Sequence, residues 1–279
     1  MIALTEADVA AAIRTLPALP QVVMELVASL GDENCDIDRV ARSIARDPAI
    51  TAKTLRLANS SFYGLSRQVH SIDQAVTILG FAAVRNIATT SGLVAGVSAS
   101  ASGSTDLRAF WRHSLACAVA ARALAQLQQS SSAVAYTCGL LHDVGKLLLM
   151  TRFGPAYTQL LGSPAYLANP EVGTERSALG VDHAQLGAMM ARQWQLPDDM
   201  QNAIARHHQL ESGLGDLAHV VAAGNVLAHS LEASVHDDAA PRQALAAWVW
   251  QPLQMAQDDV DALVQKLRGD MAGLELLLV

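Results

Sequence analysis

Helical spacing of apolar residues runs through nearly the whole chain, and this feature limits the fold more than any other. Apolar side chains recur three and four residues apart, and no stretch shows the alternation of a half-buried strand. Carboxylates stand where helices should begin, since Asp36 precedes IDRVARSIAR, Asp47 precedes Pro48, and Asp198 and Asp199 precede MQNAIARHH. The sequence therefore predicts an all-α protein.

One stretch of small residues without charge divides the chain unequally. Gly92 to Thr105 reads GLVAGVSASASGST and becomes polar toward its end. Such a composition is typical of a linker. We therefore predict two helical subdomains, residues 1–96 and 105–279, that meet near this stretch.

The charge balance limits the partners that the chain is expected to have. The net charge is −7, with 51% hydrophobic and 16% charged residues, which excludes wholesale disorder and argues against a phosphate-coated partner such as nucleic acid. Two short helices joined at Asp47 and Pro48 loosely resemble a helix-turn-helix. The favoured interpretation is a solvated basic face, or a contact for an acidic protein. Its basic residues are Arg39, Arg42, Arg46, Lys53, Arg56 and Arg67.

The start of the chain and its cysteines indicate a cytoplasmic protein that is not held in a membrane. Glu6 and Asp8 stand where a signal peptide would carry Lys or Arg, and no run is expected to reach the ~20 apolar residues that span a bilayer. Cys35, Cys117 and Cys138 are odd in number and widely spaced, which is typical of packing residues in a reducing compartment.

The segment AYTCGLLHDVGKLLLM, residues 135–150, is apolar on all sides and predicts a buried helix. Its only charged residues are Asp143 and Lys146. A buried carboxylate without a partner is strongly unfavourable, so the adjacent His142 and Asp143 indicate a metal ion or a cation nearby. The alternative is an internal ion pair between Asp143 and Lys146, three residues apart on one helix face.

Histidines on the apolar faces of separate helices favour the metal. His113 lies on the apolar edge of FWRHSLACAVAARAL, His183 begins another helix, and His207 and His208 end a third. Each alone is more often a hydrogen-bonded core residue than a ligand, but four separate helices that all point imidazoles inward, one of them beside a buried Asp, are much harder to explain by packing. Imidazole and carboxylate suit Fe, Zn, Mn or Ni, and a shared carboxylate can bridge two such ions. The side chains expected to share one pocket are His113, His142, Asp143, His183, His207 and His208.

The order and spacing of these residues resemble the HD superfamily of metal-dependent phosphohydrolases, which includes the HD-GYP enzymes. The words FWRHS, LLHDVGK and the late HH pair carry this likeness. The N-terminal segments LPALPQVVMELV, VARSIARDPAITAKTLRLANSSFYG and SIDQAVTILGFAAVRNIA resemble more narrowly the HDOD family, the HD-related output domains of bacterial signalling. The resemblance implies an N-terminal helical bundle packed on an HD-domain-like helical subdomain.

The resemblance to the enzymes also implies roles for single residues. His113, His142 and Asp143 would hold one metal together with a late aspartate, and Asp143 would bridge to a second metal on His183, His207 and His208. Lys146, one turn further on, would be the catalytic cation that pairs with substrate phosphate. The late aspartate is replaced here by Asn225, whose amide carries no charge and should weaken the first site. The Gly-Tyr-Pro that follows HH in the cyclic-dinucleotide hydrolases is also missing.

Two functions follow from these observations. The first is a non-catalytic, regulatory signal-transduction module of the HDOD type that acts through signalling protein partners. It would retain a divalent transition metal (Fe, Mn, Zn or Ni) at partial occupancy. The alternative is a metal-dependent phosphohydrolase acting on a nucleotide or cyclic dinucleotide, which would make a phosphorylated small molecule its ligand. Helical faces of this kind can also bury against a second copy, so a homo-oligomer is an open expectation.

Overall fold

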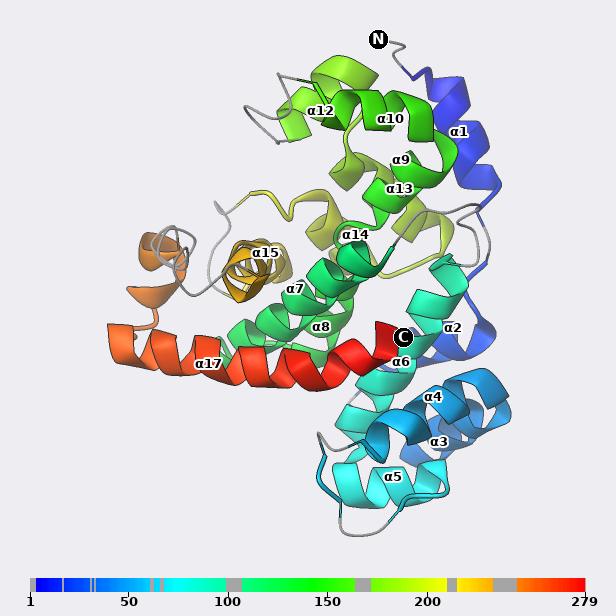
Figure 1. Cartoon of the computed structure of the whole chain (residues 1–279), viewed down its shortest axis with the longest axis vertical. Helices are drawn as coiled ribbons and strands as arrows, with labels where there is room; N and C mark the ends of the chain where they lie inside the picture. The colour runs from blue at the N-terminus through cyan, green and yellow to red at the C-terminus, as the bar shows by residue number, and fades with distance from the viewer. Residues whose placement is uncertain are drawn as a thin grey trace.

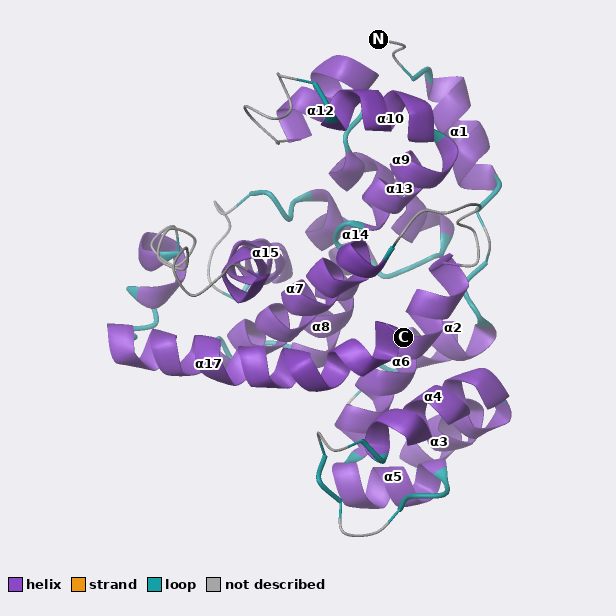
Figure 2. Ribbon diagram, in the orientation of Figure 1, coloured by secondary structure: helices purple, strands orange, loops and turns teal. Residues whose placement is uncertain are grey.

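The chain is built from helices in every part that the computed structural model describes, as Figure 2 shows. The described residues are 4–16, 18–30, 32, 34–60, 63–65, 68–98, 107–163, 172–209, 215–232 and 245–278. They contain no strand, so the all-α prediction is confirmed. The helices are α1 Glu6–Arg14, α2 Gln21–Ala28, α3 Ile37–Arg46, α4 Pro48–Ala58, α5 Ile72–Leu79, α6 Phe81–Ser98, α7 Arg108–Leu127, α8 Ser132–Leu141, α9 Val144–Arg152, α10 Gly154–Leu161, α12 Val172–Leu179, α13 His183–Gln193, α14 Asp198–Ala205, α15 Leu217–Glu232, the π-helix η1 Ala246–Trp250, α17 Gln257–Leu274 and the 3₁₀-helix η2 Glu275–Leu278.

Helices α2 to α6 form the N-terminal bundle, in which α6 packs against α2, α4 and α5. Local capping sets its helix starts. The Asp36 carboxylate accepts the Arg39 N–H at 2.9 Å at the start of α3, and Asp47 accepts the N–H groups of Ala49 and Ile50 at the start of α4. These caps satisfy backbone donors that have no partner within the helix, which is why the sequence already indicated both starts.

The expected linker is in part the end of a buried helix. Residues 92–98 continue α6, and Gly92, Leu93 and Val94 are buried there. A Cβ added to Gly92 would lie 2.3 Å from the Val23 side chain of α2, so the small residue serves close helix packing and not flexibility. The linker expectation is wrong for 92–98, and its remainder, 99–105, lies outside the described residues, as does Arg67 of the basic set.

Helices α7, α8 and α15 pack together as the centre of the C-terminal half, with α9 against α13 and α14 between α13 and α15. The segment expected to be one helix is two, because α8 ends at Leu141 and α9 begins at Val144. The stretch Ser132–Arg152 is nevertheless long and apolar enough to cross a bilayer by composition, contrary to the expectation. Its apolar window is 78% buried inside the protein, as in the core helix of a soluble protein.

Both ends of the chain cross to the opposite half. Helix α1 packs against α13, and the Leu4 N–H donates to the Leu179 carbonyl at 2.8 Å. At the other end, η2 contacts α4, α6 and α7, and Arg56 donates to the Leu276 carbonyl at 3.2 Å. Figure 1 shows α1 beside α13, and the C-terminus beside α6. The division into 1–96 and 105–279 stays a prediction.

Candidate metal centre

The turn between α8 and α9 places His142 and Asp143 in the protein interior, where the two side chains are 0% and 3% exposed. The His142 Nδ1–H donates to the Gly139 carbonyl at 2.8 Å, one turn back along α8. A carbonyl oxygen only accepts, so the proton of the neutral ring is on Nδ1 and Nε2 carries a lone pair. Burial lowers the pKa of His142, which keeps the ring neutral.

A glycine brings Asp143 to His183. Gly145 lies at the contact between α9 and α13, where a Cβ would stand 1.9 Å from the His183 carbonyl oxygen. No other residue type fits this contact without separating the helices. The approach leaves His183 Nε2 at 3.2 Å from Asp143 Oδ1.

A buried carboxylate that the sequence analysis missed orients His183. Glu175, on α12, is 1% exposed, and its Oε2 accepts both the backbone N–H and the Nδ1–H of His183, the latter at 2.6 Å. The Tyr157 hydroxyl donates to Oε1 at 3.0 Å. Burial would raise the pKa of Glu175, but the hydrogen bonds from His183 outweigh the effect of burial and hold the pKa below its ordinary value. A carboxylate on the far nitrogen is a common support of metal-binding histidines.

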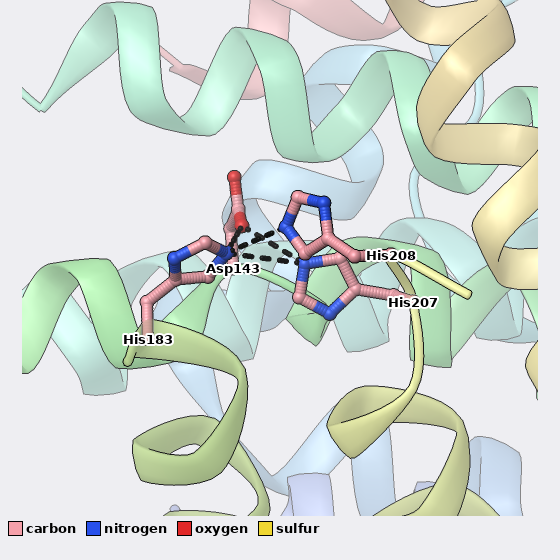
Figure 3. Close-up of side chains that lie close together, drawn as sticks. All are labelled: Asp143, His183, His207 and His208. Atoms are coloured by element: carbon pink, nitrogen blue, oxygen red, sulfur yellow. Dashed lines mark hydrogen bonds and ion pairs between the residues drawn. The ribbon is translucent and has the colours of Figure 1, made fainter. Parts of the chain in front are cut away.

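His207 and His208 lie in the turn that follows α14 and complete the group shown in Figure 3. The His207 Nδ1–H donates to the Ile204 carbonyl at 2.7 Å, which again leaves Nε2 as the lone-pair atom. Burial lowers the pKa of His207 to about 4. Desolvation, together with the neighbouring His207 and His183, lowers the pKa of His208 to about 2. Both rings are therefore neutral at neutral pH, and each can offer a nitrogen lone pair to a metal ion.

Asp143 Oδ1 and the three imidazoles around it are spaced as ligands of one ion. His183 Nε2 lies 3.2 Å from His207 Nε2 and 2.9 Å from His208 Nε2, and His207 Nε2 lies 3.5 Å from Asp143 Oδ1. Donors that each lie about 2.0–2.1 Å from one metal are about 3 Å from one another. Asp143 Oδ1 is also buried without a hydrogen bond that meets normal geometry among the described residues. Three imidazoles and a carboxylate suit Fe, Zn, Mn or Ni, so the residues fit the expected metal.

The other oxygen of Asp143 has a different partner. Lys146 Nζ donates to Oδ2 at 2.7 Å, so the ion pair considered from the sequence is present in addition to the histidine cluster. His142 Nε2 lies 3.4 Å and His113 Nε2 3.7 Å from the same oxygen. Burial would raise the pKa of Asp143, but its interactions with His142 and with the Lys146 ammonium outweigh this effect, so the pKa lies well below its ordinary value.

Asn225 lies beside His113, as the resemblance implied, with its Oδ1 3.1 Å from His113 Nε2. The opposite nitrogen of that ring, Nδ1, is 2.8 Å from Glu232 Oε2. The structure thus brings every expected site residue to one region, although their roles as ligands stay predictions. Glu175 and Glu232 were not expected, because nothing in their local sequence marks a carboxylate that meets a distant histidine.

Comparison with known proteins identifies the family. A model of the HDOD domain matches residues 16–210. A protein of Treponema pallidum (strain Nichols), named "Uncharacterized protein", is 24% identical over 272 residues, which are 96% of this chain and 52% of that protein. The chain therefore spans about half the length of this relative.

Solved structures agree with this assignment. A Shewanella amazonensis SB2B structure named "Putative phosphohydrolase" has a TM-score of 0.73 and 26% identity, and the match covers 98% of this chain and 97% of that one. A Marinobacter aquaeolei VT8 structure named "Putative signal transduction protein" has a TM-score of 0.73 and 23% identity over 97% of this chain and 65% of that one, which shows a common fold. Because the HDOD model matches more than half of the chain, this protein belongs to the HDOD family.

Proposed function

We propose that the chain is a regulatory, non-catalytic signal-transduction module that retains one divalent transition metal. The observation that carries this proposal is the unequal use of the two Asp143 oxygens. Oδ1 faces the Nε2 atoms of His183 and His207, whereas Oδ2 is held by the Lys146 ammonium at 2.7 Å. A cation is therefore already present where a second metal would need this oxygen.

The neutral amide of Asn225 supports the same interpretation. A two-metal phosphohydrolase site needs negative ligands to balance two divalent ions, and the residue beside His113 that the resemblance expects to be aspartate carries no charge. Asp143, His183, His207 and His208 would hold the single metal, which when bound would supply a fixed positive charge. The protein's own contribution is to fix three helix segments around it: the start of α9, the start of α13 and the end of α14.

The test is metal analysis combined with a hydrolysis assay. We expect the purified wild-type chain to retain Fe, Mn, Zn or Ni at this cluster, at partial occupancy, and to leave bis(p-nitrophenyl) phosphate intact. His208→Ala removes one donor and should lower the metal content, whereas His70→Ala removes an exposed histidine that is in none of the donor groups and should not. Equal metal content in the wild type and His208→Ala would overturn the proposed metal site.

A second function, metal-dependent phosphohydrolase, is favoured by one observation. His113, His142 and Asp143 also bring three donor atoms within 4.8 Å of one another, on the opposite side of the shared aspartate. A structural neighbour from Shewanella amazonensis SB2B is named "Putative phosphohydrolase". In this case Lys146 would exchange Asp143 for the phosphate of a nucleotide or cyclic dinucleotide. Hydrolysis by the metal-loaded wild type that falls at least tenfold in Lys146→Met would establish this alternative.

Signalling requires partners, and we propose protein partners in the cytoplasm. The three cysteines are free, which a reducing compartment would maintain. A second copy of the chain is a further candidate partner, which sedimentation at several concentrations would test. Nucleic acid is not part of the proposal, because the net charge of −7 opposes contact with a phosphate backbone.

A further inference from the structure

His113 also belongs to a different donor group, with two side chains of α15, where α7 passes the C-terminal end of α15. His113 Nδ1 lies 2.8 Å from Glu232 Oε2, and the rings of His113 and His229 have their centroids 4.8 Å apart. One ligand atom from each of these three residues lies within 4.8 Å of the other two. The group shares no residue with the cluster of Asp143, His183, His207 and His208.

The hydrogen bonding of His113 indicates what this group accommodates. The Asn225 amide oxygen, 3.1 Å from His113 Nε2, is an acceptor, so Nε2 carries a proton. On the other side of the ring, Nδ1 lies 2.8 Å from Glu232 Oε2. Burial would lower the pKa of His113, but the hydrogen bond to Glu232 and the charge of Asp143 outweigh it and raise the pKa. The place between His113 Nδ1 and the Glu232 carboxylate therefore attracts positive charge, which is a proton in the absence of metal and which a divalent ion can replace. His229 adds a third donor to the same place.

The positions of the residues on α15 explain how the group arises. Asn225, His229 and Glu232 are spaced by four and three residues, so they lie on one face of the helix, toward His113. This face lacks a carboxylate at position 225 and has one two turns later. The side chains of His113 and Glu232 are 15% and 25% exposed, so an ion in solution can reach the group.

We propose that His113, His229 and Glu232 form a second divalent-metal site, of the class that binds Zn²⁺. Two histidines and one glutamate are a donor set that zinc uses when its remaining coordination position is filled by water. The site would join the first turns of α7 to the last turn of α15. It is separate from the proposed four-residue cluster, and each of the two sites can be wrong without the other.

The test is a Zn²⁺ titration of the full chain after removal of metal by a chelator, followed by calorimetry and by elemental analysis after dialysis. We expect two equivalents in the wild type and one in Glu232→Gln and in His229→Asn. His208→Ala should keep one, and the double variant Glu232→Gln/His208→Ala should bind none. The affinity at the new site should fall more than about 100-fold, because even the outer partners of metal ligands contribute 10–100-fold.

Glu275→Gln is the matched control. Glu275 also contacts α7, through Arg112 at 2.8 Å, but belongs to none of the donor groups, so this variant should bind two equivalents. Far-UV circular dichroism of each variant checks that the helices are retained.

The outcomes separate the two sites. Suppose the wild type binds one equivalent of Zn²⁺, and that His208→Ala removes it whereas Glu232→Gln does not. This result would overturn the inference and leave the proposed function standing. One equivalent that Glu232→Gln removes and His208→Ala leaves unchanged would do the reverse. If the wild type binds no zinc, this inference is wrong and the contact of His113 with Glu232 is a hydrogen bond around a proton, whereas the proposed function is decided by the Fe, Mn and Ni content of the purified chain.

Discussion

At the scale of single residues, Glu175 shows how the centre depends on side chains that would not touch the metal. Its carboxylate is almost fully buried and accepts three hydrogen bonds, two from His183 and one from Tyr157. An ionised carboxylate is acceptor-only, so it fixes the Nδ1–H form of His183 and leaves Nε2 facing Asp143.

We expect Glu175→Gln to weaken metal binding about 10–100-fold. The glutamine amide has only one acceptor oxygen, and its NH₂ group would face an N–H or O–H donor of His183 or Tyr157 that now bonds to the second carboxylate oxygen. The variant should also lose about 1–3 kcal/mol of unfolding free energy, since buried donors lose their partners. Metal titration and urea unfolding measure the two effects.

Tyr157→Phe is the control for this change. It removes one hydrogen bond to Glu175 and touches neither nitrogen of His183, so it should cost about 1 kcal/mol and leave metal affinity unchanged. If Tyr157→Phe weakens metal binding as much as Glu175→Gln, then Glu175 does not act through the His183 ring.

At the scale of helices, the contact between α9 and α13 sets the distance between Asp143 and His183. The two helices approach until Gly145 meets the His183 carbonyl, and the space for a Cβ is absent there. The centre is therefore positioned by backbone packing, two residues after the aspartate in the sequence.

Gly145→Ala should force α9 and α13 apart, because its Cβ would stand 1.9 Å from a backbone oxygen that cannot move alone. We expect a loss of about 1–3 kcal/mol in unfolding free energy, typical of overpacking, together with reduced metal content. Urea unfolding and elemental analysis provide the measurements.

Gly269→Ala provides the comparison, since it is the same substitution within helix α17 with no atom near the new Cβ. It should gain roughly 0.5–1 kcal/mol, because alanine restricts the unfolded chain and favours helix. Equal effects of the two substitutions would show that the contact at Gly145 is not tight.

The same scale shows which elements the sequence could predict. The starts of α3 and α4 follow from Asp36 and Asp47, because an N-cap acts on residues two or three positions away. The break at His142 and Asp143 was not predictable, because helical apolar spacing continues through it. Gly92 was misinterpreted, since a small residue looks the same in sequence whether it lies in a linker or beneath Val23.

The candidate site divides in the same way. His113, His142, Asp143, His183, His207 and His208 could be named from their apolar surroundings and their resemblance to a known order. Glu175, Glu232 and the glycine contact at His183 could not, because their partners lie far away in the sequence and only the packing of the helices brings them together.

At the scale of the whole molecule, the last residues hold the two halves together. Leu277 is 1% exposed within η2, which contacts α4 and α6 of the first half and α7 of the second. Leu276 beside it is 43% exposed. Neighbouring leucines thus have opposite environments.

Leu277→Ala should lower the unfolding free energy by about 2–5 kcal/mol, because it leaves a cavity between the halves. Leu276→Ala should change it by less than about 0.5 kcal/mol, as exposed substitutions do. Thermal and urea unfolding of the two variants test this difference. Equal stability of both would mean that η2 is not part of the core.

The crossing of the two chain ends has a topological consequence, because each half binds a terminal segment of the other half. Helix α1 lies on α13, and η2 lies on α4 and α6. Two co-expressed fragments, 1–98 and 107–279, should therefore bind each other and co-purify without the intervening peptide. Deleting residues 1–16 from the first fragment and 275–279 from the second should weaken this complementation, which gel filtration would detect. Each half is thus held by a segment from the other half. Because α1 packs against α13, a displacement of α1 should act directly on the helix that begins with His183.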